Sequence, residues 1–86
     1  MYFVYILRCK DNSLYTGITN NIEKRMKDHA SGKGSKYVMT RLPFIMVYSE
    51  EAKDKSSALK REYAIKKLSK TNKEKLLKNQ SLSNTM

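Results

Sequence analysis

The stretch YFVYILRCKDNSLYTGI, residues 2–18, decides the fold. Its first eight residues are rich in β-branched and aromatic types, and apolar side chains fall on both alternations, which predicts a central strand covered on both faces. KDNS at 10–13 is a cluster of turn residues, and LYTGI at 14–18 predicts a second, shorter strand. Together the three segments predict a β-hairpin.

The length of the hairpin loop decides which faces its two tyrosines occupy. A two-residue loop at Asp11 and Asn12 would place Tyr5 and Tyr15 on opposite faces of the sheet. A three-residue loop, with Asn12 or Ser13 in the left-handed region, would place both on one face. A site shared by the two tyrosines requires the second arrangement.

A helix should follow the hairpin. NNIE at 20–23 resembles a capping box, with Asn20 as the N-cap and Glu23 three residues later. The helix then extends over about 21–30, and spacing by four predicts a buried stripe. The residues of that stripe are Ile22, Met26 and Ala30.

The rest of the chain predicts one more strand and two more helices. SGKGSK at 31–36 indicates a basic, flexible loop, and FIMVYS at 44–49 a third strand. Asp54 or Ser56 can cap a second helix ending near residue 68, and Ser69 or Thr71 can begin a third.

The expected architecture is therefore α+β, in the order β-β-α-β-α-α, with a three-stranded antiparallel sheet in the order 2-1-3 and helices packed on it. We expect one domain over residues 1–79 and a disordered tail over 80–86, because the tail has no anchoring apolar residues in a regular pattern.

Charge points to a polyanionic partner. The chain of 86 residues carries 18 Lys and Arg against 8 Asp and Glu, a formal net charge of +10. A surplus of this size is typical of proteins that bind nucleic acid, although it can also serve solubility alone. The interpretation we favour is a nucleic-acid partner.

The cysteine count and the absence of long apolar runs indicate the cellular compartment. Cys9 is the single cysteine, so no intrachain disulfide or Cys/His zinc pattern exists, and a buried structural thiol in a reducing compartment is expected. No apolar run approaches the roughly 20 residues that span a bilayer. The first residues also lack the features of a secretory signal. We expect a cytoplasmic monomer that does not engage a membrane.

One carboxylate lies where an apolar residue is expected. On a helical wheel, Glu62 falls inside the apolar arc that Ala58, Leu59 and Ile65 define. Carboxylates are rarely buried unless they are paired or bind a metal. Glu62 therefore either faces a cleft, or extends to water or pairs with a cation, Arg61 or Lys66.

The first helix shows a similar feature. Arg25 and His29 are four residues apart, so they share a face at the margin of the buried stripe. Each alone has an ordinary explanation, solvation for Arg25 and the helix dipole for His29. Their convergence with Tyr5 and Tyr15 beside one sheet favours a site.

These residues follow a known pattern. VYI at 4–6 and YTG at 15–17, which contains Gly17, occupy the positions of two sequence motifs, and Arg25, His29 and Glu62 follow at matching positions on later helices. GKGSKY at 32–37 and ALKREYAIKKLS at 58–69 extend the match. The chain thus resembles the GIY-YIG nuclease superfamily, in particular its small, single-domain bacterial branch, from residue 1 to about 77.

The chain departs from that pattern at three places. Val4 stands where the first motif has glycine, and Ile18 stands where some members have a lysine. Some members also carry an asparagine near the last helix, for which Asn72 is the nearest candidate. The missing lysine leaves the activation of the nucleophile open.

The resemblance implies hydrolysis of phosphodiester bonds with one divalent ion, Mg²⁺ or Mn²⁺. Glu62 would hold the metal and Arg25 the phosphate, while Tyr5 would orient water or phosphate. The resemblance makes Tyr15 the first candidate for the base and His29 the second, although the pKa values, about 10 for free tyrosine and about 6.5 for histidine, favour His29 on chemistry alone.

Further cations are candidates for holding the nucleic-acid backbone, and such contacts carry no sequence information. They are Lys33, Lys36, Arg41, Lys60 and Lys67. Selectivity would then come from the shape of the substrate, DNA first and RNA as the alternative, or from a protein partner. Two other interpretations stay open: a nucleic-acid-binding module without turnover, and a basic adaptor for an acidic protein.

Overall fold

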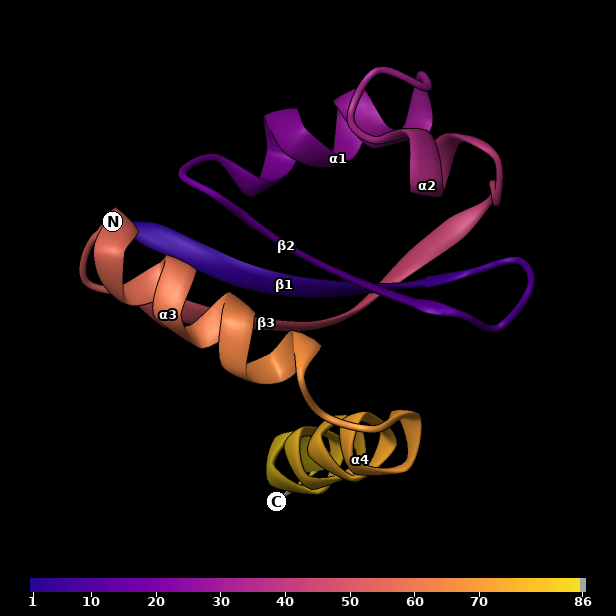
Figure 1. Cartoon of the computed structure of the whole chain (residues 1–86). Helices are drawn as coiled ribbons and strands as arrows, with labels where there is room; N and C mark the ends of the chain where they lie inside the picture. Colours follow the sequence, from indigo (N-terminus) through magenta and orange to yellow (C-terminus); the bar gives the residue numbers. More distant parts are fainter. Residues whose placement is uncertain (86) are drawn as a thin grey trace.

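The computed structural model describes the backbone of residues 1–85 and the side chains of residues 1–78. The elements follow one another along the chain (Figure 1) as β1 (Tyr2–Cys9), β2 (Leu14–Thr19), α1 (Ile22–Ala30), α2 (Lys36–Met39), β3 (Phe44–Ala52), α3 (Lys55–Lys66) and α4 (Lys70–Thr85). The expected disordered tail, 80–86, lies outside the residues whose side chains are described. No helix in the described part is long and apolar enough to cross a membrane.

The sheet has the predicted topology. Both neighbours of β1 are antiparallel to it, and the strand order is β2-β1-β3. A register shift between Ile6 and Leu7 leaves Val47 of β3 as a bulge residue. In Figure 1, α1 and α2 lie on one side of the sheet and α3 on the other. The central strand is therefore covered on both faces, as its apolar pattern predicts.

Two small cores result from this layering. Val4 and Ile6 of β1 pack with Ala58 and Ile65 of α3 on one face. The second core lies on the other face. It contains Tyr5, Leu7 and Cys9 of β1 together with Val38 of α2. The Cys9 thiol is buried, and burial raises its pKa, which agrees with an inert structural thiol.

The expected cap and stripe of α1 need correction. The N-cap is Asn21 rather than Asn20, and its Oδ1 accepts a hydrogen bond of 3.1 Å from the Lys24 N–H. Ala30 is exposed, whereas His29 is buried in its place. The buried face of α1 therefore carries a titratable side chain.

The later elements differ from expectation in smaller ways. Residues 36–39, within the expected basic loop and the residues after it, form the short helix α2. Strand β3 continues to Ala52, and Asp54 rather than Ser56 caps α3. Leu59, expected in the apolar arc of α3, is exposed.

Candidate active site

The hairpin turn places both tyrosines on one face. Asn12 has a φ of 69°, and the Cys9 N–H donates to the Ser13 carbonyl over 2.9 Å, which closes a three-residue loop. Tyr5 therefore pairs with Gly17, and the ring centroids of Tyr5 and Tyr15 lie 6.4 Å apart. The arrangement that the site requires is confirmed.

Gly17 makes room for the end of the Tyr5 side chain. A Cβ at Gly17 would lie 2.5 Å from the Tyr5 hydroxyl oxygen and 2.7 Å from Cζ. The tyrosine thus reaches across its cross-strand partner toward the open edge of β2. A glycine at this position is needed for close approach and not for an unusual φ.

Helix α1 completes a buried hydrogen-bond network around Tyr5. The Tyr5 hydroxyl lies 2.7 Å from His29 Nε2 and accepts a hydrogen bond of 3.2 Å from Arg25 Nε. The Tyr5 oxygen can accept from Arg25 and still form its hydrogen bond with Nε2 in either direction, according to which imidazole nitrogen carries the proton. Arg25 Nη2 also donates to the Gly34 carbonyl over 3.1 Å.

The imidazole is tightly enclosed. His29 is 1% exposed, and its Nδ1 has no hydrogen-bond partner among the described residues. A Cβ at Gly34 would lie 2.5 Å from that nitrogen, so the loop backbone packs directly against the ring. The ring also meets Tyr15 edge to face, with 5.5 Å between centroids.

Burial sets the protonation states of this network. It lowers the pKa of His29, and the positive charge of Arg25 lowers it further, against a smaller opposing effect of Asp28. Burial likewise raises the pKa of Tyr5, although its hydrogen bond from Arg25 opposes this. At neutral pH the network therefore consists of a neutral histidine, a neutral tyrosine and a charged arginine.

Arg25 connects the two tyrosines. Its pKa is raised first by the hydrogen bond to Tyr5, and the charge and hydroxyl of Tyr15 contribute in the same direction. The guanidinium also lines a polar cavity of about 190 Å³, together with Thr19, Asn20, Asn21, Lys24 and Asp28. A planar cation at the wall of such a cavity can bind a phosphate oxygen pair.

Glu62 approaches from the opposite face of the sheet. Helix α3 packs against β1, β2 and β3, and the Glu62 side chain is 19% exposed, between the buried Ala58 and Ile65. Its Oε2 lies 3.3 Å from Lys66 Nζ, so the predicted cationic partner is Lys66. The charge of Glu62 also raises the pKa of Tyr5, which places the carboxylate within electrostatic range of the network.

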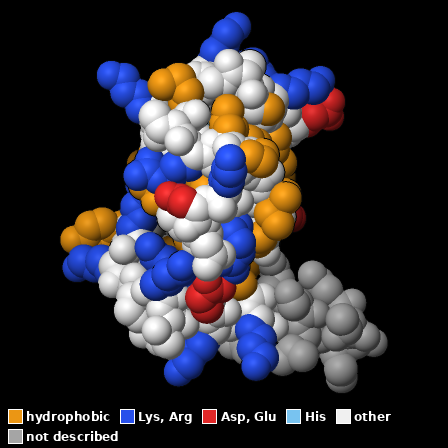
Figure 2. All heavy atoms as spheres, turned by 90° about the vertical axis from the view of Figure 1, so that its right-hand side faces the viewer, with side chains coloured by type: hydrophobic (Ala, Val, Ile, Leu, Met, Phe, Trp, Pro, Cys, Tyr) orange, Lys and Arg blue, Asp and Glu red, His pale blue; other side chains and the backbone are white. Residues whose placement is uncertain are grey.

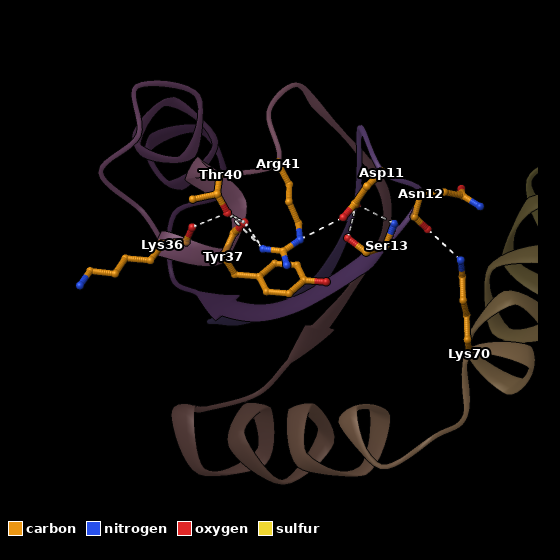
Figure 3. Close-up of polar contacts among 8 residues, drawn as sticks. All are labelled: Asp11, Asn12, Ser13, Lys36, Tyr37, Thr40, Arg41 and Lys70. Atoms are coloured by element: carbon orange, nitrogen blue, oxygen red, sulfur yellow. Dashed lines mark hydrogen bonds and ion pairs between the residues drawn. The ribbon is translucent and has the colours of Figure 1, made fainter.

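The predicted backbone-binding cations fall into two groups. Lys33, Lys36 and Lys60 are exposed. Arg41 is instead engaged within the protein: its Nε donates to Asp11 Oδ2 over 3.0 Å, and its Cζ lies 3.8 Å from the centroid of the Tyr37 ring (Figure 3). Lys67 lies over the Tyr63 ring at 4.6 Å.

Tyr37 is a site neighbour that the sequence analysis missed. Its ring stacks on Tyr15, with centroids 5.9 Å apart and planes inclined by 27°. The four-residue helix that carries it is too short to show a periodic pattern, so the sequence contains no helical signal there.

Asn72, the nearest candidate for the asparagine that some family members carry, lies at the start of α4, where its N–H donates to Ser69 Oγ.

With this geometry in place, the relatives of the chain can be compared. A family model described as the GIY-YIG catalytic domain matches residues 1–81. The chain belongs to the GIY-YIG family. A UPF0213 protein of Staphylococcus haemolyticus is 51% identical over 76 residues, covering 88% of this chain and 93% of that protein. The resemblance to the small single-domain branch of the nuclease superfamily is therefore confirmed.

Two solved structures share the GIY-YIG fold of this chain. The solution NMR structure of a UPF0213 protein from Bacillus halodurans has a TM-score of 0.59 at 47% identity and covers 91% of this chain and 84% of its own. That of a protein from E. faecalis has a TM-score of 0.65 at 42% identity, with coverages of 94% and 86%.

The departures from the GIY-YIG motifs lie away from the tyrosine network. Val4 and Ile18 are cross-strand partners, and both pack into the core under α3. Tyr5 and Gly17 are the next pair, on the other face of the hairpin. Val4, at the glycine position of the first motif, and Ile18, at the lysine position after the second, are thus two paired apolar residues that pack in one core.

Proposed function

We propose that the protein is a metal-dependent endonuclease that hydrolyses phosphodiester bonds in DNA and selects substrates by structure rather than sequence. One observation carries the proposal. Arg25 is held by Tyr5 and by the Gly34 carbonyl at the wall of a polar cavity, beside Tyr15 and within range of Glu62. The proposal joins a phosphate-binding cation and a hydroxyl on one face of the sheet with a carboxylate that approaches from the other face (Figure 1).

Arg25 would bind the phosphate whose charge grows in the transition state. Its Nε donates to the Tyr5 hydroxyl and its Nη2 to the Gly34 carbonyl, and the Tyr15 hydroxyl is a further hydrogen-bonding neighbour of the guanidinium. A guanidinium held by these contacts loses little further side-chain freedom when it binds a phosphate. We expect this preorganisation to favour the transition state over ground-state binding.

Tyr15 is the better candidate for the group that meets the attacking water. His29 is enclosed, and its Nε2 contacts the Tyr5 hydroxyl, so it reaches no substrate directly. Tyr5 is completely buried as well. We therefore assign His29 and Tyr5 the task of holding Arg25 and the hydroxyl network in position, which leaves Tyr15 as the partly exposed member.

Glu62 fits a single hard cation. The described residues contain no cluster of three His, Cys, Asp or Glu side chains that could hold an ion. Mg²⁺ needs no such cluster, because it keeps several waters and accepts one carboxylate plus a phosphate oxygen. Glu62 Oε1 has no partner among the described residues. When bound, the ion would neutralise charge on the leaving oxygen.

A binding module without turnover is the second candidate. The Glu62–Lys66 ion pair and the apolar Ile18 in place of a lysine favour it, because both remove a feature that catalysis would use. Under this alternative the basic surface would hold nucleic acid, and the buried network would only stabilise the fold. Turnover by the purified protein separates the two.

The test compares cleavage of flaps, nicked duplexes, single strands and RNA with Mg²⁺ or Mn²⁺. We expect cleavage by the wild type and a loss of roughly 10²-fold or more in rate for Arg25→Ala, the scale of removing one transition-state donor. Its affinity for nucleic acid should change little. Lys27→Ala, an exposed lysine on α1 that does not line the cavity, is the matched control for lost charge.

Two results would count against the proposal. Absence of cleavage by the wild type on every substrate would favour the binding module. Equal losses of rate and affinity in Arg25→Ala would make Arg25 one more backbone contact, shared with the lysines.

A further inference from the structure

Helix α3 exposes an apolar and aromatic strip beside Glu62. Leu59 is 46% exposed and Tyr63 is 63% exposed, which is unusual for large apolar side chains. At about 100° per residue, both lie on the side of Glu62 that faces away from the buried Ala58 and Ile65. Glu62 therefore stands at the boundary between the core of α3 and this strip.

Tyr63 differs from the other tyrosines of the chain. Tyr5 and Tyr48 are buried. Tyr37 is covered on its ring by Tyr15 and Arg41. Tyr63 has only the Lys67 Nζ over its ring, 4.6 Å from the centroid, and most of its surface meets solvent. Its ring is thus available for stacking.

The surroundings of the strip are cationic. Apart from Glu62, every charged side chain of α3 is Lys or Arg. On the face at the right-hand side of Figure 1, Lys and Arg side chains also outnumber Asp and Glu (Figure 2). An aromatic ring among lysines matches the chemistry of a nucleotide, because the base has a π-face and the phosphate is anionic.

We propose that Leu59, Tyr63 and Lys67, which we call the α3 platform, bind an unpaired nucleotide of a single-stranded nucleic acid beside Glu62, the residue that we propose holds the metal. The inference rests on the proposed function. Tyr63 stacks on the base, Leu59 contacts its edge and Lys67 contacts the phosphate. Bases within a duplex are already stacked on their neighbours, so the platform favours unpaired segments.

Binding without metal tests the platform separately from catalysis. Fluorescence anisotropy with a fluorescein-labelled single-stranded DNA, the same sequence as RNA, and the blunt DNA duplex gives three affinities in EDTA. We expect Tyr63→Ala to weaken binding of the single strands by roughly tenfold and binding of the duplex little. Tyr63→Phe should keep wild-type affinity, because the ring rather than the hydroxyl stacks.

Ile45→Ala is the matched control, since Ile45 on β3 is 63% exposed, equal to Tyr63, and the change alters no charge. It should leave all affinities unchanged. The proposal is overturned if Tyr63→Ala binds single strands as the wild type does, or if it loses single strand and duplex equally. If the wild type binds single strands through Tyr63 but cleaves no substrate, the platform stands and only the proposed nuclease function is wrong. If the wild type and Tyr63→Ala cleave at the same rate, the nuclease function stands and only the platform is wrong.

Discussion

The imidazole of His29 lies at the centre of the site, where burial and the Arg25 guanidinium both lower its pKa. In the unfolded chain the same group titrates at about 6.5. Below that pH the unfolded chain binds a proton that the folded protein does not, so the free energy of unfolding decreases as pH falls toward the lowered pKa. Protonation would also place a second positive charge beside the Arg25 guanidinium.

We therefore predict a melting temperature that decreases from about pH 7 to about pH 5, with a smaller decrease in His29→Gln. The glutamine keeps a polar group at the site but does not titrate. Subtracting the two pH profiles removes the contribution of the carboxylates, which titrate at lower pH. Parallel profiles for the wild type and His29→Gln would show that His29 is not held neutral by the fold.

At the scale of elements, hydrogen bonds link the tip of the β1–β2 hairpin to α2 and to α4. Asp11 accepts from Arg41, whose Nη1 donates to the Tyr37 carbonyl over 3.1 Å (Figure 3). Lys70 of α4 donates to the Asn12 carbonyl over 2.9 Å. Tyr37 in turn stacks on Tyr15, so the Asp11–Arg41 pair holds the element that supports the candidate base.

Asp11→Asn separates this bracing role of Arg41 from nucleic-acid binding. If Arg41 braces Tyr37, the asparagine weakens the pair, and the cleavage rate falls by up to about fivefold, the scale of an exposed ion pair. If Arg41 instead contacts the nucleic acid, losing the carboxylate releases it, and affinity rises. Rate and affinity measured together decide, with Arg41→Ala as the reference for complete loss of the guanidinium.

Much of the element-level structure was predictable, because it depends on local patterns. The apolar run of β1, the turn cluster and the cap at Asp54 each act within a few residues. The burial of His29 in place of Ala30 on α1 was not predictable, because it depends on tertiary packing rather than on the local sequence pattern. The same limit applies to Tyr37, whose stacking on Tyr15 depends on tertiary contacts.

The candidate site was also predictable only in part. Tyr5 and Tyr15 share a face, as a three-residue loop requires, and Glu62 lies beside the apolar arc. The enclosure of His29 by Gly34 could not be foreseen, because it depends on how the loop after α1 folds back onto the ring.

At the scale of the whole molecule, the net charge of +10 coexists with a carboxylate on a mostly buried face. The ion pair with Lys66 is an i,i+4 pair with a half-exposed lysine, worth about 0.3–0.5 kcal/mol. So small a contribution does not explain a carboxylate at this position by stability alone. The central claim is that Glu62 holds the metal.

Glu62→Gln tests that claim most directly, because it keeps the size of the side chain and removes its charge. Glu51→Gln, an exposed carboxylate on β3, is the control. Each variant is measured by thermal melting and by Mg²⁺-dependent cleavage. We predict that Glu62→Gln melts close to the wild type and binds nucleic acid at least as well, yet loses cleavage, while Glu51→Gln keeps it. A destabilised Glu62→Gln protein that cleaves at the wild-type rate would show that Glu62 does not hold a metal.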